Sequence, residues 1–188
     1  QEVLSPELPI AHGYGRPYNY IELPDEDGLF ELRDVPHGTL TQEFYKSKIS
    51  DNWEKLILYL PPCVPSAGLP VLYLQHGFGE SEISWSTTGK VNFLMDNLIA
   101  AGKIKPFAIV MGNGMVKQRI DGELKLNRAL YGQMLVEEIL PMLEKKYQFG
   151  GSKEKRGMAG LSMGSVQTTR IICAHPELFS EVGIFSGF

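Results

Sequence analysis

The chain has 188 residues, a formal net charge of -4 at pH 7, and 43% hydrophobic against 21% charged residues. That balance is typical of a globular protein and excludes a disordered chain, because there is ample apolar surface to bury. The sequence has no apolar run near the ~18 residues of a membrane span and no basic cluster, which argues against membrane and nucleic-acid partners.

Residues 1–36 differ in composition from the rest of the chain. Five prolines and three glycines punctuate them, and the acidic triplet Asp25-Glu26-Asp27 is typical of a solvated turn. We predict an extended arm or linker over 1–36, followed by one folded domain over 37–188.

From residue 39 onward, short apolar segments alternate with segments of helical periodicity. The first two predicted strands form an antiparallel hairpin, and the later ones are continuous apolar runs typical of a buried parallel sheet. The sequence therefore predicts an α/β fold, with helices on both faces of a mostly parallel sheet and a leading antiparallel hairpin. The predicted strands are 39–46, 53–60, 71–75, 107–111, 156–159 and 182–185, and the predicted helices are 92–101, 135–147 and 162–174.

Two cysteines, Cys63 and Cys173, lie far apart in the sequence. We expect two buried free thiols, although the sequence leaves a disulfide open. The chain has no C-x-x-C motif and its four histidines are widely spaced, so no structural zinc site is predicted.

The segment Gly160-Leu161-Ser162-Met163-Gly164 matches the G-x-S-x-G pattern. It follows a predicted strand and begins a predicted helix, which is the context that a nucleophile turn requires. Small residues on both sides let the strand and helix approach closely, so that Ser162 Oγ stands above the sheet edge. The Met163 N–H at the helix N-terminus then points toward a developing oxyanion. Ser162 is the predicted nucleophile.

A second motif, Gln75-His76-Gly77-Phe78-Gly79-Glu80, follows the strand predicted at 71–75. The corresponding loop of an α/β-hydrolase supplies the other oxyanion donor, which we assign to the Phe78 N–H. We interpret His76 as a side chain that holds this loop by hydrogen bonds rather than as a general base.

These motifs resemble the feruloyl esterase and acetylxylan esterase family (carbohydrate esterase family 1), within the broader esterase D group. The resemblance covers about residues 35–188, and Ser165 departs from it where the family usually has a second glycine. The segments that carry it are Val71-Leu72-Tyr73-Leu74-Gln75-His76-Gly77, Trp85, Gly89-Lys90, Asp96-Asn97-Leu98, Val110-Met111, Asn113, Gly160-Leu161-Ser162-Met163-Gly164 and Pro176-Glu177-Leu178-Phe179.

The resemblance implies two-step ester hydrolysis through an acyl-enzyme on Ser162, without a metal or organic cofactor. It implies a secreted or periplasmic enzyme that releases ferulate or acetate from xylan. Trp85 is a candidate wall for the acyl group or a sugar, or else a core tryptophan. Asn113 either reaches the substrate or satisfies loop backbone, and Gln167 is interpreted as structural.

The acid–base pair of the triad is not recognisable. In this fold Asp or Glu and then His follow the serine, but no aspartate follows Ser162 and His175 is the only later histidine. His175 stands 13 residues along the predicted helix, roughly 20 Å away, whereas a general base needs about 3 Å. We therefore interpret the chain as the N-terminal part of a longer hydrolase, incomplete at its C-terminus.

Alternatives remain open at this point. One is a related esterase acting on siderophore esters or S-formylglutathione. Another is a non-catalytic fragment or carbohydrate-binding module that keeps the hydrolase fold without its triad. Further hypotheses are self-association through an exposed sheet edge, or a second polypeptide that complements the fold.

Overall fold

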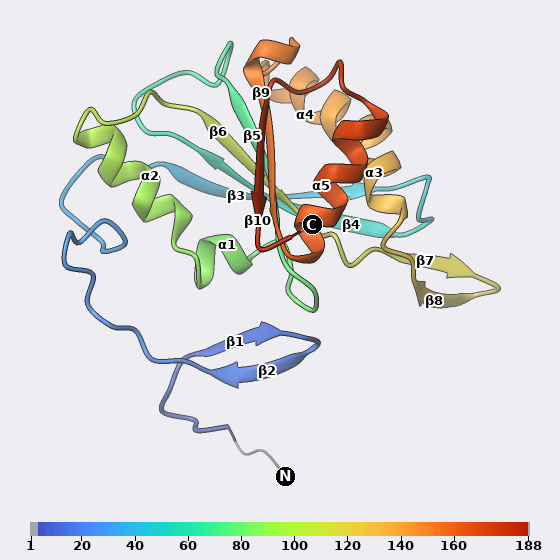
Figure 1. The fold of residues 1–188 in the computed structure, drawn as a ribbon, viewed down its shortest axis with the longest axis horizontal. Helices are drawn as coiled ribbons and strands as arrows, with labels where there is room; N and C mark the ends of the chain where they lie inside the picture. Colours follow the sequence, from blue (N-terminus) through green and yellow to red (C-terminus); the bar gives the residue numbers. More distant parts are fainter. Residues whose placement is uncertain (1–3, 188) are drawn as a thin grey trace.

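The computed structural model describes residues 4–187, and its centre is a six-stranded sheet (Figure 1). Four strands run parallel, and an antiparallel hairpin completes one side, as the sequence predicts. The order across the sheet is β10 (Glu181–Phe185), β9 (Arg156–Leu161), β5 (Val71–Gln75), β6 (Ala108–Gly112), β4 (Trp53–Leu60) and β3 (Thr39–Lys46).

Helices cover both faces of the sheet, which confirms the predicted α/β class. Figure 1 shows two helices on one side of the sheet and the remaining long helical segments on the other. The first pair is α1 (Ser84–Thr87) and α2 (Val91–Ala100); the second group is α3 (Leu130–Met134), a π-helical turn η1 (Leu135–Ile139), α4 (Leu140–Tyr147) and α5 (Met163–Ala174). A short 3-10 turn, η2 (Lys153–Lys155), precedes β9.

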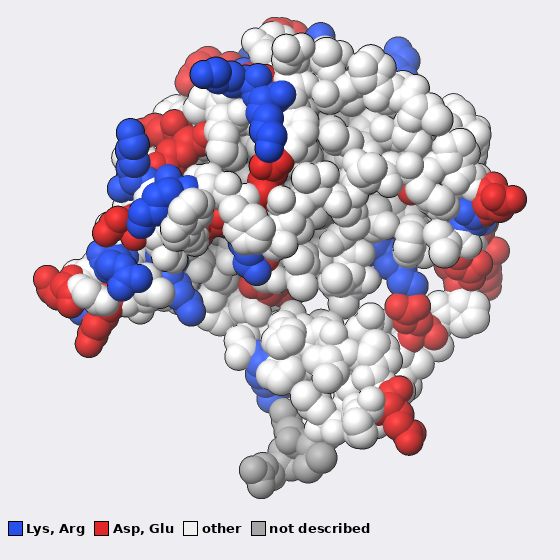
Figure 2. Space-filling model, turned by 180° about the vertical axis from the view of Figure 1, so that it is seen from behind, with Lys and Arg blue, Asp and Glu red and all other residues white. Residues whose placement is uncertain are grey.

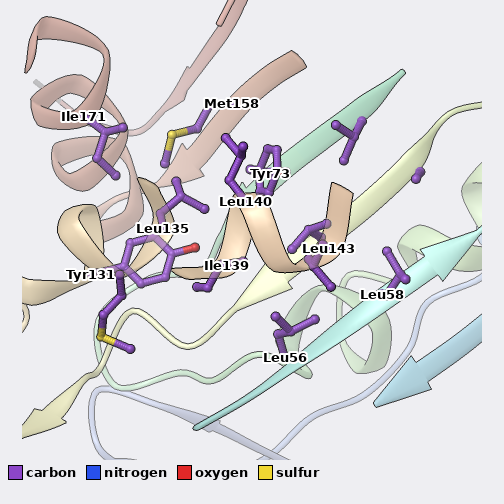
Figure 3. Packing of buried hydrophobic residues seen from close by; sticks show 14 of the residues in the cluster. Leu56, Leu58, Tyr73, Tyr131, Leu135, Ile139, Leu140, Leu143, Met158 and Ile171 are labelled. Carbon is purple, nitrogen blue, oxygen red and sulfur yellow. The ribbon is translucent and has the colours of Figure 1, made fainter. Parts of the chain in front are cut away.

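The larger hydrophobic cluster lies between the sheet and the α3–α5 group (Figure 3). Tyr131, Leu135, Ile139 and Leu143 recur at helical spacing, and each is at most 2% exposed. Burying one such aliphatic side chain contributes roughly 1.5–3 kcal/mol. This helical segment therefore fixes the position of the sheet beneath the candidate site.

The helix predicted at 135–147 begins earlier, at Leu130, and passes through the π-helical turn. The turn directly precedes Pro141, which lies in the first turn of α4. Proline has no N–H to donate to the preceding turn, so the regular α-helical ladder cannot continue unchanged through this point.

Two small hairpins were not predicted. One lies in the N-terminal arm, β1 (Ile10–Gly13) with β2 (Arg16–Asn19), and the other is β7 (Lys117–Ile120) with β8 (Glu123–Leu126). Strand β8, Glu-Leu-Lys-Leu, does alternate polar and apolar residues, yet all four are exposed. The sequence signal of the second hairpin is Asp121-Gly122, because this dipeptide favours a tight hairpin turn, and φ is positive at both residues.

The arm between the first hairpin and β3 is held against α2 by buried polar side chains. The Asn97 side-chain amide donates to the carbonyls of Leu29 and Glu31, at 2.8 and 2.9 Å. His37 Nδ1 lies 2.9 Å from the Asp96 carboxylate, and this hydrogen bond raises the pKa of His37. The arm is thus fixed to the body, while the division of the chain at residue 36 stays a prediction.

The expectation of two buried thiols is wrong. Cys63 and Cys173 are free, but both are exposed. Cys63 lies in a turn with φ +60°, and Cys173 lies in the last turn of α5, away from the buried Ile171 face. Over residues 4–187, no helix is long and apolar enough to cross a membrane.

Candidate active site

Ser162 lies at a sharp turn between β9 and α5. Its backbone has φ +53° and ψ -111°, a region that L-residues rarely adopt. Its side chain is exposed, whereas the residues after it in the first turn of α5 are buried. The turn therefore presents the serine at the edge of the sheet, as the motif predicts. Such backbone strain is typical of functional positions.

The two glycines of the motif leave no room for a side chain. A Cβ on Gly160 would lie 2.2 Å from the Gly164 carbonyl oxygen. A Cβ on Gly164 would lie 2.7 Å from the carbonyl oxygens of both Gln75 and His76. These neighbours are backbone atoms and cannot rotate aside. Because these two glycines have no side chains, the start of α5 contacts the end of β5.

Hydrogen bonds hold the backbone of Ser162. Its N–H donates to the Phe185 carbonyl at the end of β10, at 2.9 Å. Its carbonyl accepts from the N–H of Ser165 at 3.0 Å and from the Ser165 hydroxyl at 2.5 Å. Ser165, the departure from the family pattern, therefore makes an additional hydrogen bond to the nucleophile turn.

His76 is buried and holds two loops together. The Gly114 N–H donates to its Nε2 at 3.0 Å, and its Nδ1 lies 2.8 Å from the Gly77 carbonyl. Because Nε2 accepts a hydrogen bond, the proton of the neutral ring is on Nδ1. Burial lowers the pKa of His76. Both nitrogens are occupied, which confirms its interpretation as a loop-holding residue.

The peptide group between Phe78 and Gly79 is held through its carbonyl oxygen. Its C=O accepts from the Tyr14 N–H at 3.0 Å, and the Arg128 guanidinium lies 5.1 Å from the centre of the Phe78 ring. One residue earlier, the Gly77 N–H donates to the Glu80 carboxylate at 2.9 Å. Within residues 4–187, the Phe78 N–H has no hydrogen-bond acceptor.

The Met163 N–H is the first of helix α5, so it has no acceptor within the helix. Gln75, at the end of β5, pairs with Gly160 in β9, which places the loop after β5 beside the serine turn. The two predicted donor segments are therefore neighbours. The role of the Phe78 and Met163 N–H groups stays a prediction.

Trp85 is half-buried in α1, and its ring contacts that of Phe185 at a centroid distance of 6.4 Å. It borders a hollow together with Glu80 and Leu161, the residue before Ser162. Its indole N–H is buried and has no hydrogen-bond partner among residues 4–187. Trp85 thus packs against a hydrophobic cluster and also borders the hollow, while its contact with substrate stays a prediction.

Asn113 follows β6, and its Oδ1 accepts from the Met115 N–H at 2.9 Å. Its oxygen thus satisfies loop backbone, the second of the two predicted roles. Its contact with substrate stays a prediction.

Gln167 is buried in α5 and connects three segments. Its Nε2 donates to the carbonyls of Gly114 and Arg128, at 3.0 and 3.2 Å. Its Oε1 accepts from the Gln75 side chain at 3.4 Å. The structural role predicted for Gln167 is confirmed, although no sequence signal identifies its partners.

The structure does not bring a base to Ser162. His175 lies at the C-terminal end of α5, with Nδ1 3.5 Å from the Glu177 carboxylate. In the described part of the chain, no histidine hydrogen-bonds to the serine. That part of the chain also contains no cluster of three or more metal-ligating side chains. Within the described residues, the candidate site therefore contains Ser162 and the two neighbouring segments that carry the Phe78 and Met163 N–H groups.

Comparison with known proteins also points to an esterase. A family model described as "Putative esterase" matches residues 47–188. The chain is 38% identical over 176 residues to an endo-1,4-beta-xylanase/feruloyl esterase of Xylanibacter ruminicola, covering 89% of this chain and 24% of that protein.

Solved structures share the fold. A ferulic acid esterase from Anaeromyces mucronatus in complex with ferulic acid superposes with a TM-score of 0.77 at 22% identity, covering 87% of this chain and 63% of the other. The feruloyl esterase module from Clostridium thermocellum, an S954A mutant complexed with sinapinate, gives 0.71 at 20% identity, covering 95% and 61%. The chain thus spans about a quarter of the curated relative and about three fifths of these structures. The motif, the fold and the match over residues 47–188 together show that the chain belongs to the esterase family.

Proposed function

We propose that this chain carries the nucleophile of a serine esterase that removes feruloyl or acetyl groups from plant cell-wall xylan. The observation that carries the proposal is the strained Ser162 turn, packed through Gly164 against the loop that bears Phe78. The substrate class is supported by the 38% identity to a protein named xylanase/feruloyl esterase.

In the proposed reaction, Ser162 Oγ attacks the ester carbonyl and loses its proton to a general base. The tetrahedral oxyanion is stabilised by the N–H groups of Phe78 and Met163, and removal of one such donor costs ~3 kcal/mol. The sugar hydroxyl leaves with a proton, and an acyl-enzyme remains. Water then attacks the acyl carbonyl, releasing the carboxylic acid and restoring Ser162.

The base of this reaction is a histidine oriented by an aspartate, as the family resemblance implies, and neither is identifiable among residues 1–188. His76 is unsuitable because both of its ring nitrogens are already hydrogen-bonded inside the loops. Trp85, which borders the hollow beside the serine, serves as a wall for the aromatic acyl group. A secreted or periplasmic location follows from the polymeric substrate.

The test is hydrolysis of methyl ferulate by the 188-residue chain and by the full-length protein, each beside its Ser162→Ala variant. We expect the full-length protein to be active and its variant to lose at least a thousandfold in kcat. A panel with acetylated xylan, a siderophore ester and S-formylglutathione separates the related esterases. A full-length protein without activity on any ester would contradict the proposal and favour a non-catalytic module.

A further inference from the structure

The β1–β2 hairpin touches the loop that carries the predicted oxyanion donor. The Tyr14 N–H donates to the Phe78 carbonyl at 3.0 Å. A Cβ on Gly79 would lie 2.0 Å from the Gly15 nitrogen and 2.5 Å from the Tyr14 carbonyl carbon. The hairpin turn and the loop are therefore in direct backbone contact, with no side chain between them.

The base of the hairpin is closed by one side chain. Asn19 Oδ1 accepts from the Ser5 N–H at 2.7 Å, and its Nδ2 donates to the carbonyls of Ser5 and Leu8, at 3.1 and 3.2 Å. In Figure 1 the hairpin lies beneath the loops that follow the sheet strands. In the rear view of Figure 2 it forms a mainly uncharged lobe below the body.

Between the hairpin and the loop lies a hollow of about 480 Å³, bordered by Tyr14, Arg16, Tyr18 and Glu80. Glu80 also borders the smaller hollow that contains Trp85 and Leu161, directly before Ser162. Glu80 thus borders both hollows.

The chemistry of the larger hollow suits a neutral sugar. Tyr14 is 82% exposed and Tyr18 is 40% exposed, so both rings present apolar faces with a polar tip to solvent. Arg16 and Glu80 add groups of opposite charge, which together favour a polyhydroxylated ligand over an ionic one. Exposed aromatic groups of this kind, rimmed by polar residues, mark binding surfaces.

We propose that the β1–β2 hairpin and Glu80 form a saccharide subsite, which binds the sugar chain of the ester whose carbonyl is at Ser162. The inference rests on the proposed function and extends it, because it assigns the sugar part of the substrate to a segment outside the matched residues 47–188. Tyr14 is the principal stacking residue, and Trp85 remains on the acyl side.

The experiment is calorimetric titration of the 188-residue chain with an arabinoxylo-oligosaccharide that carries no ester. The test variant is Tyr14→Asn, because Tyr14 has φ +52° and asparagine tolerates this conformation. Tyr14→Phe keeps the ring, and Phe44→Ala is the matched control, since Phe44 is 62% exposed on the distant edge strand β3. An unchanged thermal unfolding midpoint checks that each variant folds.

We expect the parent chain, Tyr14→Phe and Phe44→Ala to bind alike, and Tyr14→Asn to bind about tenfold more weakly. The subsite is overturned if the parent does not bind the oligosaccharide, if Tyr14→Asn binds as the parent does, or if Phe44→Ala weakens binding equally. The titration needs no catalysis. Failure of the esterase assay together with intact, Tyr14-dependent binding would therefore overturn the proposed reaction and leave the subsite standing.

Discussion

The two segments that carry the predicted oxyanion donors are held in place by different forces. The turn at Gly160–Gly164 is fixed by steric contact, because its two glycines allow backbone to meet backbone. The loop at His76–Glu80 is held by hydrogen bonds from the N–H groups of Gly114 and Tyr14, and by one from the Gly77 N–H to the Glu80 carboxylate. Each segment also uses the other kind of contact, since hydrogen bonds hold the Ser162 backbone and Gly79 meets the hairpin backbone. At Gly164, however, steric contact joins a helix to the sheet, whereas His76 joins two loops through hydrogen bonds.

This difference predicts different responses to substitution. A steric contact between backbone atoms has no alternative arrangement at low cost, so adding one methyl group displaces a whole element. A hydrogen-bonded loop loses one partner at a time, so its response is graded. The following substitutions test that contrast, beginning with the largest expected effect.

Gly164→Ala is expected to disrupt the serine turn. Its Cβ would lie 2.7 Å from two carbonyl oxygens at the end of β5, so helix α5 must move away from the sheet. Overpacking of this kind costs typically 1–3 kcal/mol. Urea unfolding measures the loss of stability, and kcat/KM of the full-length protein is expected to fall about 100-fold through misplacement of the serine.

The matched control is Gly157→Ala in the same strand, β9. There the nearest atom to a new Cβ is a flexible Leu72 methyl at 3.4 Å, an ordinary contact. We expect the free energy of unfolding of this variant to be close to that of the parent. If the two substitutions lower the free energy of unfolding equally, steric contact at Gly164 is not the cause of the destabilisation.

His76→Ala is expected to loosen the loop without displacing an element. It leaves the buried Gly114 N–H without its acceptor, at a cost of about 1–3 kcal/mol. His76→Gln restores an acceptor near the Nε2 position and should recover part of that loss. The same urea measurement compares the three proteins, and a glutamine variant no more stable than the alanine variant would rule out the Gly114 hydrogen bond as the cause.

The smallest expected effect is a pH dependence of stability. Burial lowers the pKa of His76 in the folded state, so below about pH 6.5, the ordinary value for histidine, the unfolded chain binds more protons than the folded chain. The stability contributed by neutral His76 is complete above this pH and declines as the pH falls below it. His37, whose pKa is raised by Asp96, acts in the opposite direction.

The comparison of parent and His76→Gln between pH 8 and pH 5 isolates this effect, because both proteins keep His37. We expect the parent to lose more stability on acidification than the variant does. Parallel pH profiles would mean that His76 does not titrate differently in the folded and unfolded states.

The same contrast explains what could be predicted from the sequence. The strands at 39–46, 53–60 and 71–75 have the predicted bounds, because apolar periodicity is a local property. The Ser162 turn was equally accessible, since its glycines lie within two residues of the serine. The His76–Gly114 and Gln167–Arg128 hydrogen bonds were not, because they join residues far apart in the sequence. The exposure of Cys63 depended on a turn conformation that the sequence does not reveal.

The hydrogen bond from the Ser162 N–H to the Phe185 carbonyl has a consequence for biosynthesis. As the chain leaves the ribosome, strand β9 and helix α5 emerge before β10, so the serine turn lacks this partner until a further strand has been translated. The Ser162 turn therefore gains this hydrogen bond only after β10 has been translated. A nascent chain that pauses between α5 and β10 would hold the motif without this hydrogen bond.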